Sequence, residues 1–176
     1  VIVCSTGLIG ELLPMPKIVA GLDAIAPLLD NDGLQTSAQA IMTTDSVAKI
    51  ATGNINGAEF AGIAKGAGML APALATMLSV VMTDAIVSDN AQEIFQRATD
   101  RTYNRIDSDG CTSTNDTVLF MSSGASGVEI SDDDLEKMLM QVCGSLSAQL
   151  IADAEGSSKT VAINVLNASS EKDAVE

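Results

Sequence analysis

The chain is rich in hydrophobic residues but almost without aromatic ones, and this imbalance limits how its core can be built. Hydrophobic residues make up 47% of the 176 residues, aromatic residues only 2%, and tryptophan is absent. The core must therefore consist mainly of Ala, Val, Ile, Leu and Met side chains, which suit close packing of helices on a sheet. A chain of this length suffices for one domain with a substantial core, and we expect a single α/β region over residues 1–176.

Hydrophobic periodicity predicts three helical segments. Residues 9–29 are mostly helical in period, and apolar residues recur at helical spacing over 91–106 and 135–150. Side chains that can cap a helix precede the last two segments. The expected caps are Ser88 or Asp89 for the second helix, and Ser131 with Asp134 for the third.

Short apolar runs outside these helices predict strands. The run at 77–84 is β-branched at its centre and indicates a strand buried on both faces, while Asn and Gly at 54–57 suit a hairpin turn. The expected strands are residues 1–4, 39–43, 58–64, 77–84, 114–121 and 160–166. The resulting order, β-α-β-β-β-α-β-α-β, favours a layered α/β domain.

The charge balance restricts the partners of the chain. Nine Lys and Arg against 23 Asp and Glu give a formal net charge of −14, which repels nucleic acid and anionic membrane surfaces. The three cysteines are widely spaced and form no metal-binding signature, which is typical of free thiols in a reducing compartment. The first residues resemble no signal peptide and no apolar window is long enough to span a bilayer, so we expect a cytoplasmic protein.

The chain contains no histidine. Acting alone, it therefore cannot use Ser-His-Asp or Cys-His catalysis or a histidine zinc site, and we expect no metal and no cofactor. The remaining bases are carboxylates, lysines and a chain-terminal amine. Thr76, in the glycine-rich apolar stretch after Lys65, suits the last of these. A threonine at a new N-terminus can use its own amine, with a pKa of roughly 7.7–8.0, as the general base. A packing role is the alternative, and the residues alone leave both interpretations open.

Five motifs occur in one order along the chain. They are Ser5-Thr-Gly-Leu-Ile-Gly-Glu-Leu-Leu-Pro-Met, Ala40-Ile-Met-Thr-Thr-Asp45, the stretch from Gly62 through Lys65-Gly-Ala-Gly to Thr76-Met-Leu, Thr83-Asp-Ala85, and Asp109-Gly-Cys-Thr-Ser-Thr-Asn-Asp-Thr117. Together they resemble the ornithine acetyltransferase family, also called glutamate N-acetyltransferase. The resemblance extends to about Asn167.

The resemblance implies a role for each matching residue. Members of this family cleave themselves before the threonine that matches Thr76, so the bond Ala75-Thr76 is expected to break and Thr76 to act as nucleophile. Thr6 and Gly7 match the positions that form the oxyanion hole. Thr43, Lys65 and Thr76 match substrate-binding positions, although a lysine on a surface turn is the alternative for Lys65.

The resemblance also implies a function and an assembly. Acetyl would pass from N2-acetylornithine to Thr76 and then to glutamate, with acetyl-CoA as an alternative donor. Residues 1–75 would end an α chain and residues 76–176 would begin a β chain, assembled as a heterotetramer. Members are roughly twice as long and carry a further substrate-binding glutamate that is absent here, so we interpret the chain as a central fragment. The alternatives are a fragment without activity, and a hydrolase or aminopeptidase with the same threonine chemistry.

Overall fold

The computed structural model describes residues 2–7, 10–29, 32–70 and 77–175. Its helices are α1 (Met15–Ile25), α2 (Leu34–Ala40), α3 (Ala91–Asp100), α4 (Asp132–Ala152) and α5 (Glu171–Val175), with 3-10 turns at Ala26–Leu28 and Tyr103–Arg105. The strands are β1 (Lys49–Ile55), β2 (Ala58–Lys65), β3 (Leu78–Thr83) and β4 (Thr117–Ser122). They form one sheet in the order β1-β2-β3-β4, antiparallel except for the parallel pair of β3 and β4.

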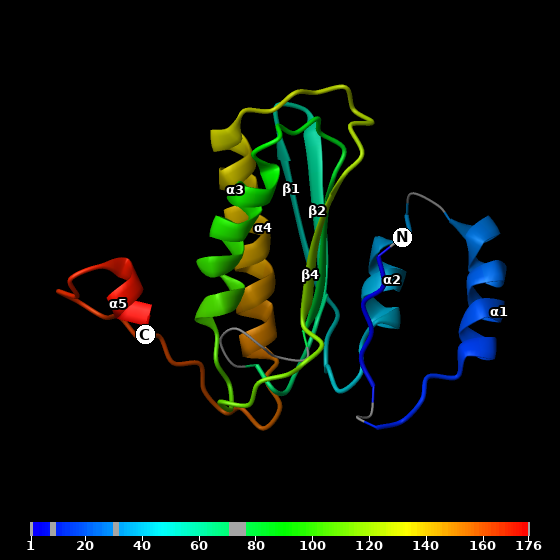
Figure 1. Cartoon of the computed structure of the whole chain (residues 1–176), viewed down its shortest axis with the longest axis horizontal. Coiled ribbons are helices and arrows are strands. Elements are labelled where there is room, and N and C mark those ends of the chain that lie inside the picture. Colours follow the sequence, from blue (N-terminus) through cyan, green and yellow to red (C-terminus); the bar gives the residue numbers. More distant parts are fainter. Residues whose placement is uncertain (1, 8–9, 30–31, 71–76, 176) are drawn as a thin grey trace.

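The sheet lies between two groups of helices (Figure 1). On one side α4 packs along β1 and β2, and α3 packs on α4. On the other side α2 contacts the same two strands, and α1 lies farther out (Figure 1). The layered α/β architecture that the sequence predicts is therefore confirmed.

The core lies between the sheet and α4, and aliphatic side chains dominate it as the composition requires. The apolar stripe predicted for the third helix is entirely buried, and its members are Leu135, Met138, Leu139, Val142, Leu146 and Leu150. Gly62 of β2 faces this stripe, and a Cβ atom there would lie 2.9 Å from side-chain atoms of both Val142 and Leu146. A glycine at this position therefore lets the helix approach the sheet closely.

The predicted start of α4 is confirmed in detail. The Ser131 hydroxyl accepts a hydrogen bond from the Asp134 N–H at 3.1 Å, as an N-cap does. For α3 the prediction is close, because the helix begins at Ala91 after Asn90 instead of Ser88 or Asp89. The structure also ends α3 at Asp100 and continues with a 3-10 turn, so it is shorter than its apolar pattern indicated.

Several predicted elements are wrong. Neither residues 2–4 of the strand predicted at 1–4 nor residues 160–166 form a regular strand, because neither segment pairs with another strand among the described residues. Of the apolar run at 39–43, the first two residues end α2 and the other three form no strand. The helix expected over 9–29 is regular only in α1. Strand β1 was not predicted. The observed order is α-α-β-β-β-α-β-α-α, without the 3-10 turns.

Candidate active site

The candidate site lies where β2 ends and β3 begins. Lys65 is the last residue of β2 and faces Leu78, the first residue of β3. Its side chain is buried, with 3% of the residue exposed, so the interpretation as a lysine on a surface turn is wrong. Burial lowers the pKa of Lys65, while the negative charges of Asp45 and Asp116 oppose that effect. A buried cation therefore lies near two carboxylates at this end of the sheet.

Asp45 joins the turn that carries Thr43 to the end of β2. Its Oδ1 accepts the Gly66 N–H at 2.6 Å, and its Oδ2 accepts the Thr43 N–H at 3.1 Å. Burial alone would raise the pKa of Asp45, but the hydrogen bonds from Gly66, Lys49 and Thr43 outweigh it, so the pKa is lowered. The structure thus brings the loop of Thr43, which is exposed, close to the strand end that holds Lys65.

Lys49 holds this arrangement against the end of α4. Its fully buried Nζ donates to Asp45 Oδ1 at 2.7 Å and to Asp153 Oδ2 at 2.6 Å. Asp153 follows α4 and also accepts the Ser46 N–H at 2.9 Å. Burial raises the pKa of Asp153, but the bonds from Lys49 and Ser46 outweigh it, so the pKa is lowered.

Sequence reasoning missed Lys49, Asp153 and the role of Asp45. The spacing of Asp45 and Lys49, four residues apart beside one of the family motifs, was the one local signal available. The partner Asp153 lies 104 residues away in sequence from Lys49, so no local pattern could indicate it.

Met77, the second residue after the predicted cleavage site, is fixed by the start of β4. Met77 donates its N–H to Asp116 Oδ1 at 2.7 Å, and its carbonyl accepts the Thr117 N–H at 3.0 Å. Burial raises the pKa of Asp116, while the Met77 bond and the charge of Lys65 oppose the rise. This contact places one carboxylate at the beginning of β3, next in space to the charge of Lys65.

The remaining predicted residues are placed only in part. Ala75 and Thr76 lie outside the described residues. Thr6 is half-buried and Gly7 is exposed. Within the described part of the chain, no hydrogen bond joins Thr6 or Gly7 to Lys65 or Asp116, so their oxyanion role stays a prediction. The division of the chain at Ala75-Thr76 likewise stays a prediction.

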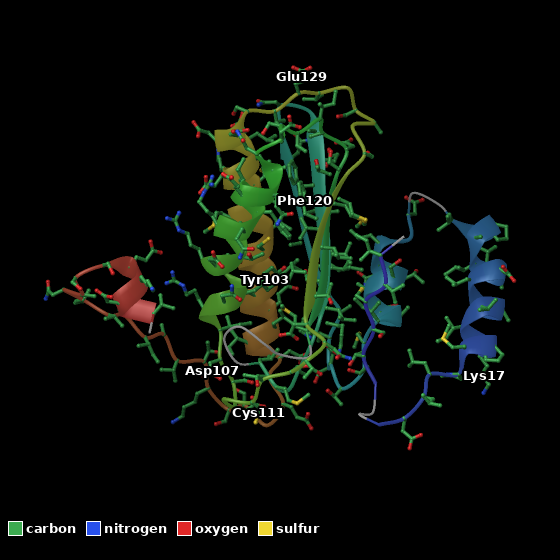
Figure 2. All side chains as sticks on the ribbon, viewed as in Figure 1. Lys17, Tyr103, Asp107, Cys111, Phe120 and Glu129 are labelled. Carbon is green, nitrogen blue, oxygen red and sulfur yellow. The ribbon has the colours of Figure 1, made fainter. Side chains whose placement is uncertain are left out.

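The candidate site occupies one end of the molecule. Asp107 and Cys111 lie in the loop before β4, at the end where α4 finishes, whereas Glu129 lies at the opposite end (Figure 2). Over residues 2–7, 10–29, 32–70 and 77–175 no group of His, Cys, Asp and Glu side chains could hold a metal ion. No helix in those ranges is both long and apolar enough to cross a membrane. Chemically, the site offers a buried ammonium group that can attract a carboxylate.

Comparison with known proteins shows the family. The sequence profile of the ArgJ family matches residues 1–176. The chain is 52% identical to the arginine biosynthesis bifunctional protein ArgJ of Thermobifida fusca over 176 residues, which are 99% of this chain and 46% of that protein. It is 51% identical to the proteins of the same name from Streptomyces coelicolor and Mycobacterium leprae, again over 99% or more of this chain. The chain spans about half the length of the curated relatives that it matches, and it belongs to the ArgJ family.

Proposed function

We propose that this chain carries the nucleophile of an enzyme that transfers an acetyl group from N2-acetylornithine to glutamate. The observation that supports this proposal most directly is Lys65, a buried cation in a chain of net charge −14, at the strand end before the predicted cleavage segment. Its position fits a residue that binds the carboxylate of an amino-acid substrate. Membership of the ArgJ family supports the same conclusion, because the relatives are named as arginine biosynthesis proteins.

In the first stage of the proposed mechanism the chain activates itself. The Thr76 hydroxyl attacks the Ala75 carbonyl, the Ala75–Thr76 C–N bond breaks as an ester forms, and the Thr76 nitrogen takes up the proton. Water then hydrolyses the ester. The products are an Ala75 carboxylate and a Thr76 residue with a free α-amine and a free hydroxyl. The amine then serves as the general base in a chain without histidine.

In the second stage the same hydroxyl transfers acetyl. The Thr76 amine accepts the hydroxyl proton as the oxygen attacks the acetyl carbonyl of N2-acetylornithine. Donors at Thr6 and Gly7 would stabilise the tetrahedral oxyanion, and ornithine leaves with the proton that the amine returns. The amine of glutamate then attacks the acetyl-threonine ester, the ester C–O bond breaks, and N-acetylglutamate leaves. The proton that the glutamate amine loses passes through the Thr76 amine to the Thr76 oxygen and restores the hydroxyl. Thr43 and Lys65 would hold the substrates during both half-reactions, and acetyl-CoA remains an alternative donor.

The assembly follows from the same proposal. Cleavage would divide the protein into an α chain that ends at Ala75 and a β chain that begins at Thr76, and pairs of these chains would form a heterotetramer. No metal or cofactor takes part in either half-reaction.

Mass spectrometry of the purified protein tests the proposal. We expect a break between Ala75 and Thr76, and acetyl transfer from N2-acetylornithine to glutamate by the full-length protein. Thr76→Ala should abolish both. Thr99→Ala, which removes a hydroxyl that donates to the Gln96 carbonyl within α3, should change neither. Transfer that survives in Thr76→Ala would refute the nucleophile, release of acetate to water alone would indicate a hydrolase, and absence of turnover would support the inactive fragment.

A further inference from the structure

One loop holds both ends of the segment that contains the predicted scissile bond. We call residues 107–117 the anchor loop. On the side before the segment, Asp109 Oδ2 accepts the Met69 N–H at 2.9 Å, and the Ser108 N–H donates to the Leu70 carbonyl at 2.5 Å. The chain is thus fixed directly before residue 71 by two consecutive residues of the anchor loop.

The backbone of Met69, which this attachment holds, has an unfavourable conformation. Met69 has φ of 53°, in the left-handed region that is unfavourable for a residue with a Cβ atom. Such a conformation persists only when surrounding contacts fix it, and the Asp109 bond to Met69 N–H is one such contact.

On the other side of the segment, the end of the anchor loop holds the start of β3. Asp116 accepts the Met77 N–H, and Thr117 donates to the Met77 carbonyl, so both backbone polar groups of this residue are bound. These two bonds fix the backbone of Met77, and through it the direction in which the chain enters β3.

The predicted cleavage separates these two attachments. Met69 belongs to the piece that ends at Ala75, whereas Met77 belongs to the piece that begins with Thr76. An attachment at Met69 can therefore influence the strain and alignment of the uncut chain. An attachment at Met77 remains next to the nucleophile before and after the cut.

We propose that Asp109 and Asp116 are positioning residues for different reactions. Asp109 aligns the chain for self-cleavage, and Asp116 aligns it for both self-cleavage and acetyl transfer. The inference rests on the proposed function. Hydrogen bonds from a backbone N–H to a carboxylate are stronger than neutral ones. Small displacements of a nucleophile reduce reaction rates steeply, by as much as about 100-fold for roughly 1 Å. The part of Asp116 that matters is its acceptor oxygen.

Four variants of the full-length protein test this division. Asp109→Ala should slow cleavage about 10-fold or more, while material that has cleaved to completion transfers acetyl at the normal rate. Asp116→Ala should slow cleavage and also lower kcat for transfer by about 10-fold to 100-fold, with little change in KM. Asp116→Asn keeps an oxygen that can accept the Met77 N–H and should restore both rates to within about 5-fold. Asp133→Ala, at an exposed position on the first turn of α4, is the matched control and should change neither rate.

Three results would overturn the inference. They are normal transfer by cleaved Asp116→Ala, equal loss of both activities in Asp109→Ala and Asp116→Ala, and an Asp116→Asn protein as slow as Asp116→Ala. A wild-type protein that neither cleaves nor transfers would refute the proposed function instead. Amide hydrogen exchange at Met77 then tests the anchoring alone: we expect faster exchange in Asp116→Ala than in Asp133→Ala, and equal exchange would refute it.

Discussion

The buried lysine at the start of β1 gives the sharpest stability prediction. Lys49→Met keeps most of the side-chain volume but removes the cation between Asp45 and Asp153, whose side chains are 0% and 10% exposed. Removing one partner of a buried ion pair typically costs about 3–5 kcal/mol, because the other charge is left without compensation. Since two carboxylates lose the same partner here, we expect a loss in the upper part of that range, about 4–5 kcal/mol at pH 7.

In Lys49→Met the dependence of stability on pH should have the opposite sign to that of the wild-type protein. In the wild-type protein the pKa values of Asp45 and Asp153 are lowered, so their stabilising contribution is present above the unfolded pKa of about 3.9 and is lost as the pH falls through the lower folded values. Without Lys49, burial is opposed by the N–H groups of Gly66 and Thr43 and by the charge of Lys65, and we expect the pKa of Asp45 to rise above its unfolded value. The variant should then gain stability between pH 7 and pH 5, where the wild-type protein gains none.

Urea unfolding followed by circular dichroism at pH 7 and pH 5 measures both effects. Lys137→Met is the matched control, because Lys137 lies exposed in the second turn of α4, and its cost should stay within about 0.5 kcal/mol. Adding Asp153→Asn to Lys49→Met should recover part of the loss, since one of the two uncompensated charges is removed. A cost below about 1 kcal/mol for Lys49→Met, or a pH slope parallel to that of the wild-type protein, would refute the reasoning.

Two further predictions concern the layer between the sheet and the helices. Gly62→Val should lower the free energy of unfolding by about 1–3 kcal/mol, because its Cβ would overlap Val142 and Leu146. Calorimetry measures this change, and unchanged stability would contradict the close approach of α4 to β2. Burial raises the pKa of the Cys143 thiol to about 12, whereas Cys111 is exposed. A thiol reagent at pH 8 should therefore modify Cys111 in the native protein and Cys143 only after unfolding. Equal rates of modification of the two cysteines in the native protein would refute this prediction.

The sequence predicted the elements whose local signals agree with their packing. In α4 the capping residue Ser131 and the apolar stripe both identify the helix, and the β-branched centre of β3 identifies a buried strand. Strand β1 was not predicted because it contains Gly53, and a glycine weakens the alternating pattern of a strand. In the structure the missing side chain leaves room for Met138 of α4. Residues 160–166 have the composition of a strand, but a strand also requires a neighbour to pair with, which a local pattern cannot supply.

In the candidate site, too, some residues could be predicted from the sequence and others could not. The motif resemblance pointed to Lys65 and Thr43, and the structure brings their loops together through Asp45. The charge network behind them depends on Lys49 meeting Asp153 at the far end of α4, which only tertiary packing determines. Sequence reasoning therefore found the residues that are predicted to bind substrate and missed the groups that hold them.

The pairing of β2 with β3 has a consequence for how a cut chain would behave. Six residue pairs join these strands, and the predicted scissile bond lies in the connection between them. A break there leaves the shared sheet in place, so both pieces would migrate together in native size measurements and separate only under denaturing conditions. Renaturation, however, would become a second-order process that depends on protein concentration, because two independent polypeptides would have to find each other. A processed protein of this kind would therefore be robust once assembled and far harder to regain after unfolding at high dilution.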